Sequence, residues 1–290
     1  MTPGPSVLPK ADGPLSDQEG STEMLQAIHP TSHSLKARAR LWLKRLMWPG
    51  SNWVSRDKSR VVRHFLTGTP ETPVRTLDCG CGNAYFAHEA VIRHSHCLGI
   101  TIHDWERRNC EEMRDYLGIS EDRMEFRSAR LDELADEPAH RGQFDQVLLL
   151  DVIEHIMDAR ATFRQIHGLL DEDGFVYVTT PDRDWQANAD RIRVTRVEDG
   201  WHVRNGYTME QLEAVLDESG FEPIDRLRFG SLGSIVVTQI QHKLFGRLID
   251  PLTVLTFPVL KLISAALAPW RRSHTIFVLA RKKRAGLAGR

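Results

Sequence analysis

The sequence predicts an α/β protein whose core is a largely parallel β-sheet. After Pro73, apolar runs of strand length alternate with segments of helical pattern, which is typical of βαβ units. The run at 146–150, Gln-Val-Leu-Leu-Leu, lacks polar alternation, as expected for a central strand covered on both faces. We therefore expect strands at 74–78, 96–101, 124–127, 144–151 and 175–180, separated by helices at 84–94, 105–117 and 158–170.

The rest of the chain adds helices at both ends of this pattern. Helices are expected at 34–48 and 56–66, before the first strand, and at 209–219, where Gly220 ends the helix. Two more strands are expected at 222–229 and 275–281. The sequence Asp-Glu-Asp-Gly before Phe175 predicts a turn.

Composition divides the chain into three parts. Residues 1–30 are rich in Pro, Gly, Ser and acidic residues and have no apolar run, so we expect a disordered tail and no signal or transit peptide. Residues 31–70 are expected to form N-terminal amphipathic helices. Residues 71–290 are expected to form one domain with a hydrophobic insertion at about 240–272.

Charge is distributed unevenly, although the formal net charge is only -1. No Asp or Glu occurs between Met24 and Arg56 or after Asp250, and eight Lys or Arg follow Asp250. These basic ends suggest phosphate groups or an anionic surface near the termini, and we expect no nucleic acid partner. Four cysteines before residue 111 do not make a disulfide framework, so we expect a reduced, cytoplasmic environment.

The loop "DCGCGNA" at 78–84 is the strongest local motif. A dinucleotide-binding turn would need a third glycine, where Tyr85 stands, and an acid at the end of the second strand, where Thr101 stands. Cys79 and Cys81 lack two further ligands in zinc spacing and would point apart, so we expect packing residues and no metal site. The remaining interpretation is a nucleoside cofactor without a pyrophosphate, approached by the backbone of Gly80 and Gly82.

Four segments in order make the prediction specific. "LDCGCGNA", "FDQVLLLDVIEHI", "LLDEDGFVYVTTP" and "HVRNGYTMEQLEAVLDESGFEP" resemble motifs of the class I S-adenosylmethionine-dependent methyltransferases, in the branch that contains the ubiquinone-biosynthesis O-methyltransferases. The resemblance covers residues 52–282. It implies a Rossmann-like, doubly wound seven-stranded sheet with helices on both faces and an antiparallel last strand, and S-adenosylmethionine as the cofactor.

The resemblance also implies roles for individual residues. The residues expected to bind the cofactor are Asp78, Gly80, Cys81, Gly82 and Asn83 at its methionine end, Thr101 and Ile102 beside the ribose, Arg130 and Leu131 beside the adenine, and Asp151 and Val152 beside the sulfonium. Thr101 replaces the acid that usually binds both ribose hydroxyls. In this respect "GITIHDWE" is similar to the cyclopropane fatty acid synthases.

Transfer to a hydroxyl needs a general base, and histidine titrates close to neutral pH. His155 follows the fourth strand and His202 lies in the long loop, so both are candidate bases, with Asp151 as a third catalytic candidate. Glu154 is expected to position the site. The acceptor stays open among small molecules, glycans and lipid-like compounds. The alternative is a non-catalytic membrane- or partner-binding module, which failure to bind S-adenosylmethionine would support.

The insertion has three interpretations: a packed helix pair, a hydrophobic lid, or a segment lying on an anionic membrane. Pro258 and Lys261 interrupt its apolar run, and a bilayer span needs about 20 mainly apolar residues. Interfacial binding would use the basic stretch 36–45 with Arg271 and Arg272. A membrane association and a lipid-like acceptor would follow from it.

Overall fold

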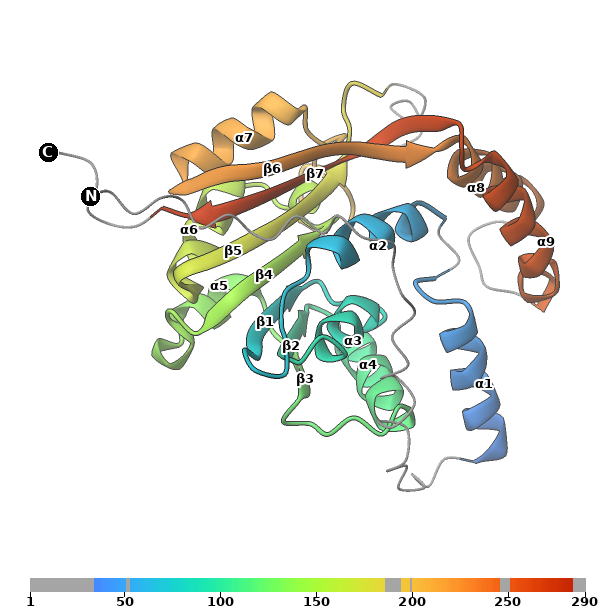
Figure 1. The fold of residues 1–290 in the computed structure, drawn as a ribbon, viewed down its shortest axis with the longest axis horizontal. Helices are drawn as coiled ribbons and strands as arrows, with labels where there is room; N and C mark the ends of the chain where they lie inside the picture. Colours follow the sequence, from blue (N-terminus) through green and yellow to red (C-terminus); the bar gives the residue numbers. More distant parts are fainter. Residues whose placement is uncertain (1–33, 51–52, 186–193, 199, 246–250, 284–290) are drawn as a thin grey trace, which may run out of the picture.

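A computed structural model describes residues 34–50, 53–185, 194–198, 200–245 and 251–283. In these residues one sheet has seven strands, in the order β3-β2-β1-β4-β5-β7-β6, and its twist is seen in Figure 1. The first five strands are parallel, and β7 runs antiparallel to both β5 and β6. The strands are β1 (Val74–Cys79), β2 (Ser95–Thr101), β3 (Met124–Ser128), β4 (Phe144–Leu150), β5 (Leu170–Pro181), β6 (Phe221–Ser231) and β7 (Arg271–Lys282).

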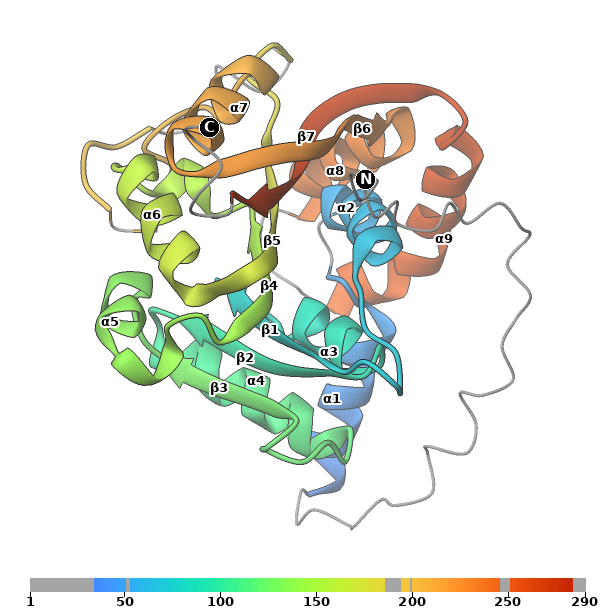
Figure 2. The same ribbon diagram turned by 60° about the vertical axis from the view of Figure 1, so that its left-hand side comes forward.

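Helices cover both faces of the sheet, which confirms the predicted doubly wound fold (Figure 2). On one face α5, α6 and α7 pack against the strands, and on the other α2, α3 and α4 do so. The helices are α1 (Leu35–Leu46), α2 (Trp53–Phe65), α3 (Tyr85–Val91), α4 (Asp104–Tyr116), α5 (Leu131–Asp136), α6 (Ala159–Leu169), α7 (Met209–Glu218), α8 (Leu232–Phe245) and α9 (Pro251–Leu267).

The strand ends are aligned at the edge where the loops leave. Cys79, the last residue of β1, pairs with Ile100 of β2 and with Leu149 of β4. Because these strands are parallel, the loops that follow them meet at one edge. The strand predicted to reach Asp151 ends at Leu150, since Asp151 has a φ of 56° and turns the chain out of the sheet.

The turn predicted at 171–174 lies inside β5, so the prediction that this strand begins at 175 is wrong. Phe144 of β4 pairs with Leu170, but Gln146 pairs with Phe175. An advance of two residues along β4 therefore corresponds to an advance of five along β5. The Asp173 N–H donates to Asp171 Oδ1 at 2.7 Å. The turn residues therefore form a bulge within a continuous strand.

The N-terminal helices are attached to the sheet and to the insertion. Val62 and Leu66 are buried against β4, β5 and β7, and Tyr177 donates its hydroxyl hydrogen to the Phe65 carbonyl at 2.9 Å. The division of the chain at residue 70 stays a prediction. The expected tail at 1–30 lies outside the described residues.

The segment that joins β6 to β7, which includes the insertion expected at about 240–272, forms two helices, α8 and α9, which pack on each other and on α2. Pro258 interrupts the apolar run of the sequence, but the helix α9 continues through it. The nearby residues Phe257 and Leu260 are buried in a cluster with Trp53, and this packing offsets the hydrogen bond that proline cannot donate. Among the described residues, no helix has the length and apolarity needed to cross a membrane.

Candidate active site

A cleft of about 430 Å³ lies at the carboxyl edge of the sheet. This volume falls within the range of about 300–1,000 Å³ that is usual for small-molecule sites. The loops after β1, β2, β3 and β4 supply its walls. Its lining includes Gly80, Gly82, Thr101, Ile102, Glu106, Arg130, Leu131, Asp151, Val152, His155 and Glu198.

The glycine loop is shaped for close approach of a ligand. The N–H groups of Gly80 and Cys81 both donate to the Ile100 carbonyl, at 2.9 and 3.1 Å, and tie the loop to β2. Gly80 has a φ of 76°, and a Cβ there would lie 2.7 Å from Val152 Cγ2. Gly82 has a φ of 54°, and only the Gly80 carbonyl lies within 4 Å of a Cβ built on it. A side chain at residue 82 would therefore project into the cleft.

Eight of the residues expected at the cofactor line this cleft, and three do not. Cys81 is buried behind the loop, with its sulfur 4.0 Å from Cys110 Sγ. Asn83 is exposed and donates its side-chain N–H to the Pro49 carbonyl at 2.8 Å. Asp78 is buried beneath the loop.

Asp78 nevertheless carries a feature that suits the methionine end of the cofactor. Its Oδ2 atom is buried and has no hydrogen-bond partner among the described residues. Burial raises the pKa of the Asp78 carboxyl to about 7, against the opposing charge of Lys58. An ammonium group close to this carboxyl would stabilise its ionised form. The glycine cradle, this unpartnered oxygen and the apolar side chains of Ile102 and Leu131 together fit S-adenosylmethionine.

Glu106 lines the cleft but was not predicted from the sequence. It lies in the first turn of α4, and the Thr101 hydroxyl donates to its Oε2 atom. The acid that is absent at the end of β2 is thus replaced by a carboxylate five residues later. An acid in the first turn of a helix that follows a parallel strand is a signal that can identify such a residue.

Asp151, directly after the last residue of β4, is held in one orientation. Its Oδ2 atom accepts a hydrogen bond from Lys58 Nζ at 2.7 Å, and its Oδ1 atom accepts one from the Thr179 hydroxyl at 2.7 Å. Burial would raise the pKa of Asp151, but the charge and hydrogen bond of Lys58 hold it below its usual value. Asp151 is therefore an ionised group at the cleft.

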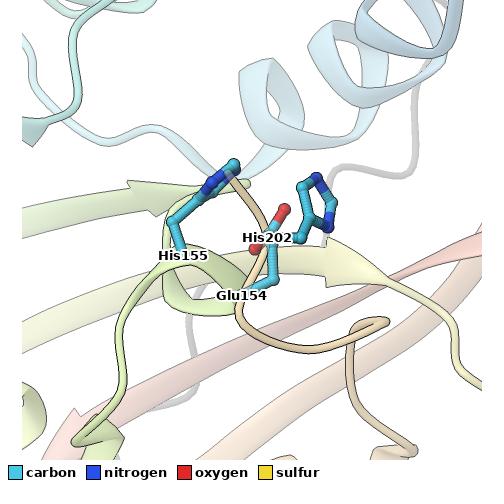
Figure 3. A group of neighbouring side chains, drawn as sticks. All are labelled: Glu154, His155 and His202. Atoms are coloured by element: carbon cyan, nitrogen blue, oxygen red, sulfur yellow. The ribbon is translucent and has the colours of Figure 1, made fainter. Parts of the chain in front are cut away.

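The two candidate bases lie side by side. The ring centroids of His155 and His202 are 4.5 Å apart, and the Glu154 side chain lies between the two rings in Figure 3. The Val203 N–H donates to the Glu154 carbonyl at 2.9 Å, which fixes the long loop against the turn after β4. His155 lines the cleft and His202 lies beside it.

The surroundings of this cluster disfavour added charge. Burial raises the pKa of Glu154 to about 8, and Thr180 donates to Glu154 Oε2 at 3.1 Å. Burial, and then the neighbouring His155, lowers the pKa of His202. The lowered pKa keeps His202 neutral at neutral pH, and the neutral imidazole is the form that can accept a proton.

The same three side chains have the reach to hold a metal ion. One potential ligand atom from each of Glu154, His155 and His202 lies within 4.8 Å of the others. No metal site was expected from the sequence, because only Cys79 and Cys81 were considered as ligands. His202 is distant in sequence, so spacing could not identify this group.

Residues 53–225 match the family described as a methyltransferase domain. The chain is 28% identical over 110 residues to the ubiquinone biosynthesis O-methyltransferase of Marinobacter nauticus, a match that covers 38% of this chain and 45% of the relative. Identity to the enzyme of the same name from Ruegeria pomeroyi is 27% over 173 residues, covering 58% and 67%. The chain therefore spans about half the length of the first relative and two thirds of the second.

A solved structure shows the same fold. The chain resembles a SAM-dependent methyltransferase from Archaeoglobus fulgidus with a TM-score of 0.54 and 14% identity, over 84% of this chain and 99% of the other.

Proposed function

The chain belongs to the methyltransferase-domain family, and from this premise we propose that it transfers the methyl group of S-adenosylmethionine to a hydroxyl of a small molecule. The observation that carries the proposal is the cleft. Its glycine loop, acidic groups and paired histidines converge at the carboxyl edge of the parallel sheet, where folds of this kind bind ligands.

S-adenosylmethionine supplies a methyl group already activated by a sulfonium, so the protein has to position the acceptor and manage its proton. Gly80 and Gly82 leave room for the backbone to approach the cofactor, and Asp78 suits its ammonium. Thr101 and Glu106 together would bind the ribose. Asp151 places a negative charge in the lining of the cleft, and Lys58 maintains its ionisation.

His155 and His202 are proposed to remove the acceptor proton. Because the rings are adjacent, one can accept the proton while the other orients it or shares the charge. The Nδ1 atoms of both rings are buried without a partner among the described residues. Each ring therefore retains an unused polar atom for an acceptor or for the neighbouring group.

The acceptor is proposed to have a lipid-like portion. Relatives are named for ubiquinone biosynthesis, and the insertion exposes apolar side chains at the same edge of the sheet as the cleft. Both observations favour a hydroxyl on an amphipathic compound. A cytoplasmic protein that associates with a membrane would meet such an acceptor.

Transfer of an isotopically labelled methyl group tests this function. The full chain is incubated with methyl-labelled S-adenosylmethionine and with separate aqueous and organic extracts of cells, and labelled products are identified by mass spectrometry. We expect an O-methylated product from the organic extract, and a much smaller yield with His155→Ala. Absence of labelled product from either extract would favour the non-catalytic alternative.

A further inference from the structure

The outward face of α9 is apolar. Leu255, Val259 and Leu262 occupy positions i, i+4 and i+7 of the helix and have 75%, 58% and 71% of their surfaces exposed. Trp270, between α9 and β7, is 58% exposed. Neighbouring residues 265, 266 and 269 are exposed Ala, Ala and Pro. A continuous apolar stripe on the outside of a folded protein indicates a surface for an apolar partner.

The opposite face of α9 is firmly packed, so the exposed stripe does not arise from a loose helix. Phe257 and Leu260 are buried, and the Phe257 ring lies 5.4 Å from the ring of Trp53. The Arg56 guanidinium lies 4.7 Å from the centre of the Phe257 ring. A Cβ on Gly233 of α8 would come within 2.3 Å of the Ser264 carbonyl, so the two helices approach closely. Packing therefore fixes which residues of α9 face outward.

The described residues of the two helices and of the segment up to β7 carry charge of one sign. Residues 232–245 and 251–273 contain no Asp or Glu. Four cations are exposed in these segments, namely Lys243, Lys261, Arg271 and Arg272. An apolar helix face bordered by Lys and Arg, with a tryptophan at its end, matches the composition of segments that lie in the interface of an anionic bilayer.

The place of α9 in the fold relates this face to the cleft. The helix pair begins where β6 ends, and β6 is parallel to β1 and β4 because each of β5 and β6 is antiparallel to β7. The helices α8 and α9 therefore extend from the same edge of the sheet as the cleft, and Figure 1 shows α8 after the arrowhead of β6. The 17 residues of α9 are fewer than the roughly 20 that a bilayer span needs.

We propose that the outward face of α9, with Trp270 and the cations Lys261, Arg271 and Arg272, docks on the surface of an anionic phospholipid bilayer. The apolar side chains enter the boundary between headgroups and acyl chains, and the cations contact lipid phosphates. This proposal rests on the proposed function, since it states where the protein would meet a lipid-like acceptor. Docking itself does not depend on the cofactor site.

Sedimentation of the full chain with vesicles tests this proposal. We expect binding to vesicles of phosphatidylcholine mixed with phosphatidylglycerol at low salt, less binding at high salt, and little binding to phosphatidylcholine alone. The variant Leu255→Ser/Val259→Ser/Leu262→Ser should reduce binding about tenfold or more, since each residue loses apolar contact with lipid. Lys261→Gln/Arg271→Gln/Arg272→Gln should reduce binding only to the anionic vesicles.

Two controls separate docking from folding and from catalysis. Ile92→Ser/Ile224→Ser removes two exposed apolar side chains on other elements and should leave vesicle binding unchanged. The α9 variant should keep the affinity of the full chain for S-adenosylmethionine in calorimetry, so failure of docking and failure of the cofactor site are distinguishable.

Two outcomes would overturn the proposal. The first is equal recovery of the full chain in the supernatant with and without anionic vesicles. The second is a dimer in solution that the α9 variant converts to monomer without any vesicle binding, which would make this face a contact between copies of the chain.

Discussion

Lys58 of α2 and Asp151 at the end of β4 form an ion pair with Nζ and Oδ2 2.7 Å apart. The lysine side chain is 8% exposed and the aspartate side chain 27%. Lys58 also lies 5.6 Å from the centre of the Phe86 ring. Through this pair the N-terminal helix contributes directly to the electrostatics of the cleft.

Replacing Lys58 by Met should lower the free energy of unfolding by about 2–3 kcal/mol, because Asp151 is left without its cation in a largely buried position. Urea unfolding followed by fluorescence measures the change. Lys283→Met is the control, since its partner Asp217 is exposed and the pair should contribute less than about 1 kcal/mol. Equal losses of stability in the two variants would show that the Lys58–Asp151 pair contributes no more than an exposed ion pair.

Stability should fall as pH rises from about 4 to about 7, through Asp78. Burial raises the folded-state pKa of this carboxyl from 3.8 to about 7. Between these values the native state binds more protons than the unfolded state, so the free energy of unfolding decreases by up to about 1.4 kcal/mol per pH unit. Asp78→Asn removes this contribution. In urea unfolding at a series of pH values, the variant should gain stability relative to the natural protein as pH rises, and parallel curves would exclude the effect.

Glu106→Ala should weaken binding of S-adenosylmethionine about tenfold, because a carboxylate that accepts hydrogen bonds in the cleft is lost. Thr101→Ala should weaken binding of the cofactor by only about 1 kcal/mol, the contribution of one neutral hydrogen bond. Glu111→Ala, on the same helix but paired with Arg107 outside the cleft, is the matched control. The role assigned to Glu106 is wrong if its variant and the Glu111 variant have equal affinities in calorimetry.

His155→Ala and His202→Ala should each lower turnover about a hundredfold while leaving the affinity for S-adenosylmethionine unchanged. The exposed His64→Ala is the control and should keep full activity. The double variant should be little slower than either single one, because the two rings act together.

A chelator decides between the two chemical roles of this cluster. Turnover that persists after treatment with EDTA is expected if the histidines act as bases. Loss of turnover that a divalent cation restores would instead assign Glu154, His155 and His202 to metal binding and contradict base catalysis.

The sheet and the cleft could be predicted because their signals are local. The apolar run at 146–150 and the glycines at 80 and 82 determine a buried strand and a loop that approaches a ligand, whatever the remainder of the chain does. The resemblance then placed Thr101, Arg130 and Asp151 at one edge, and they lie in one cleft.

Two contacts of the site could not be predicted because they join distant segments. Lys58 reaches Asp151 from a helix expected to lie outside the domain, and His202 joins Glu154 through a long loop. Local signals also failed where tertiary packing opposes them. Pro258 remains inside α9 because Phe257 and Leu260 are buried in a cluster with Trp53. Residues 171–174 form a bulge because β5 pairs with β4 both before and after them.

Titration calorimetry with two glycine variants determines whether the cleft beside the glycine loop holds S-adenosylmethionine. Gly82 and Gly142 have φ values of 54° and 62°, and neither has a close neighbour at the Cβ position, so valine strains the backbone similarly at both. Only residue 82 lies in the cleft. We predict that the natural protein and Gly142→Val bind the cofactor with equal affinity and that Gly82→Val does not bind it. Undiminished binding by Gly82→Val, or no binding by the natural protein, would contradict the account.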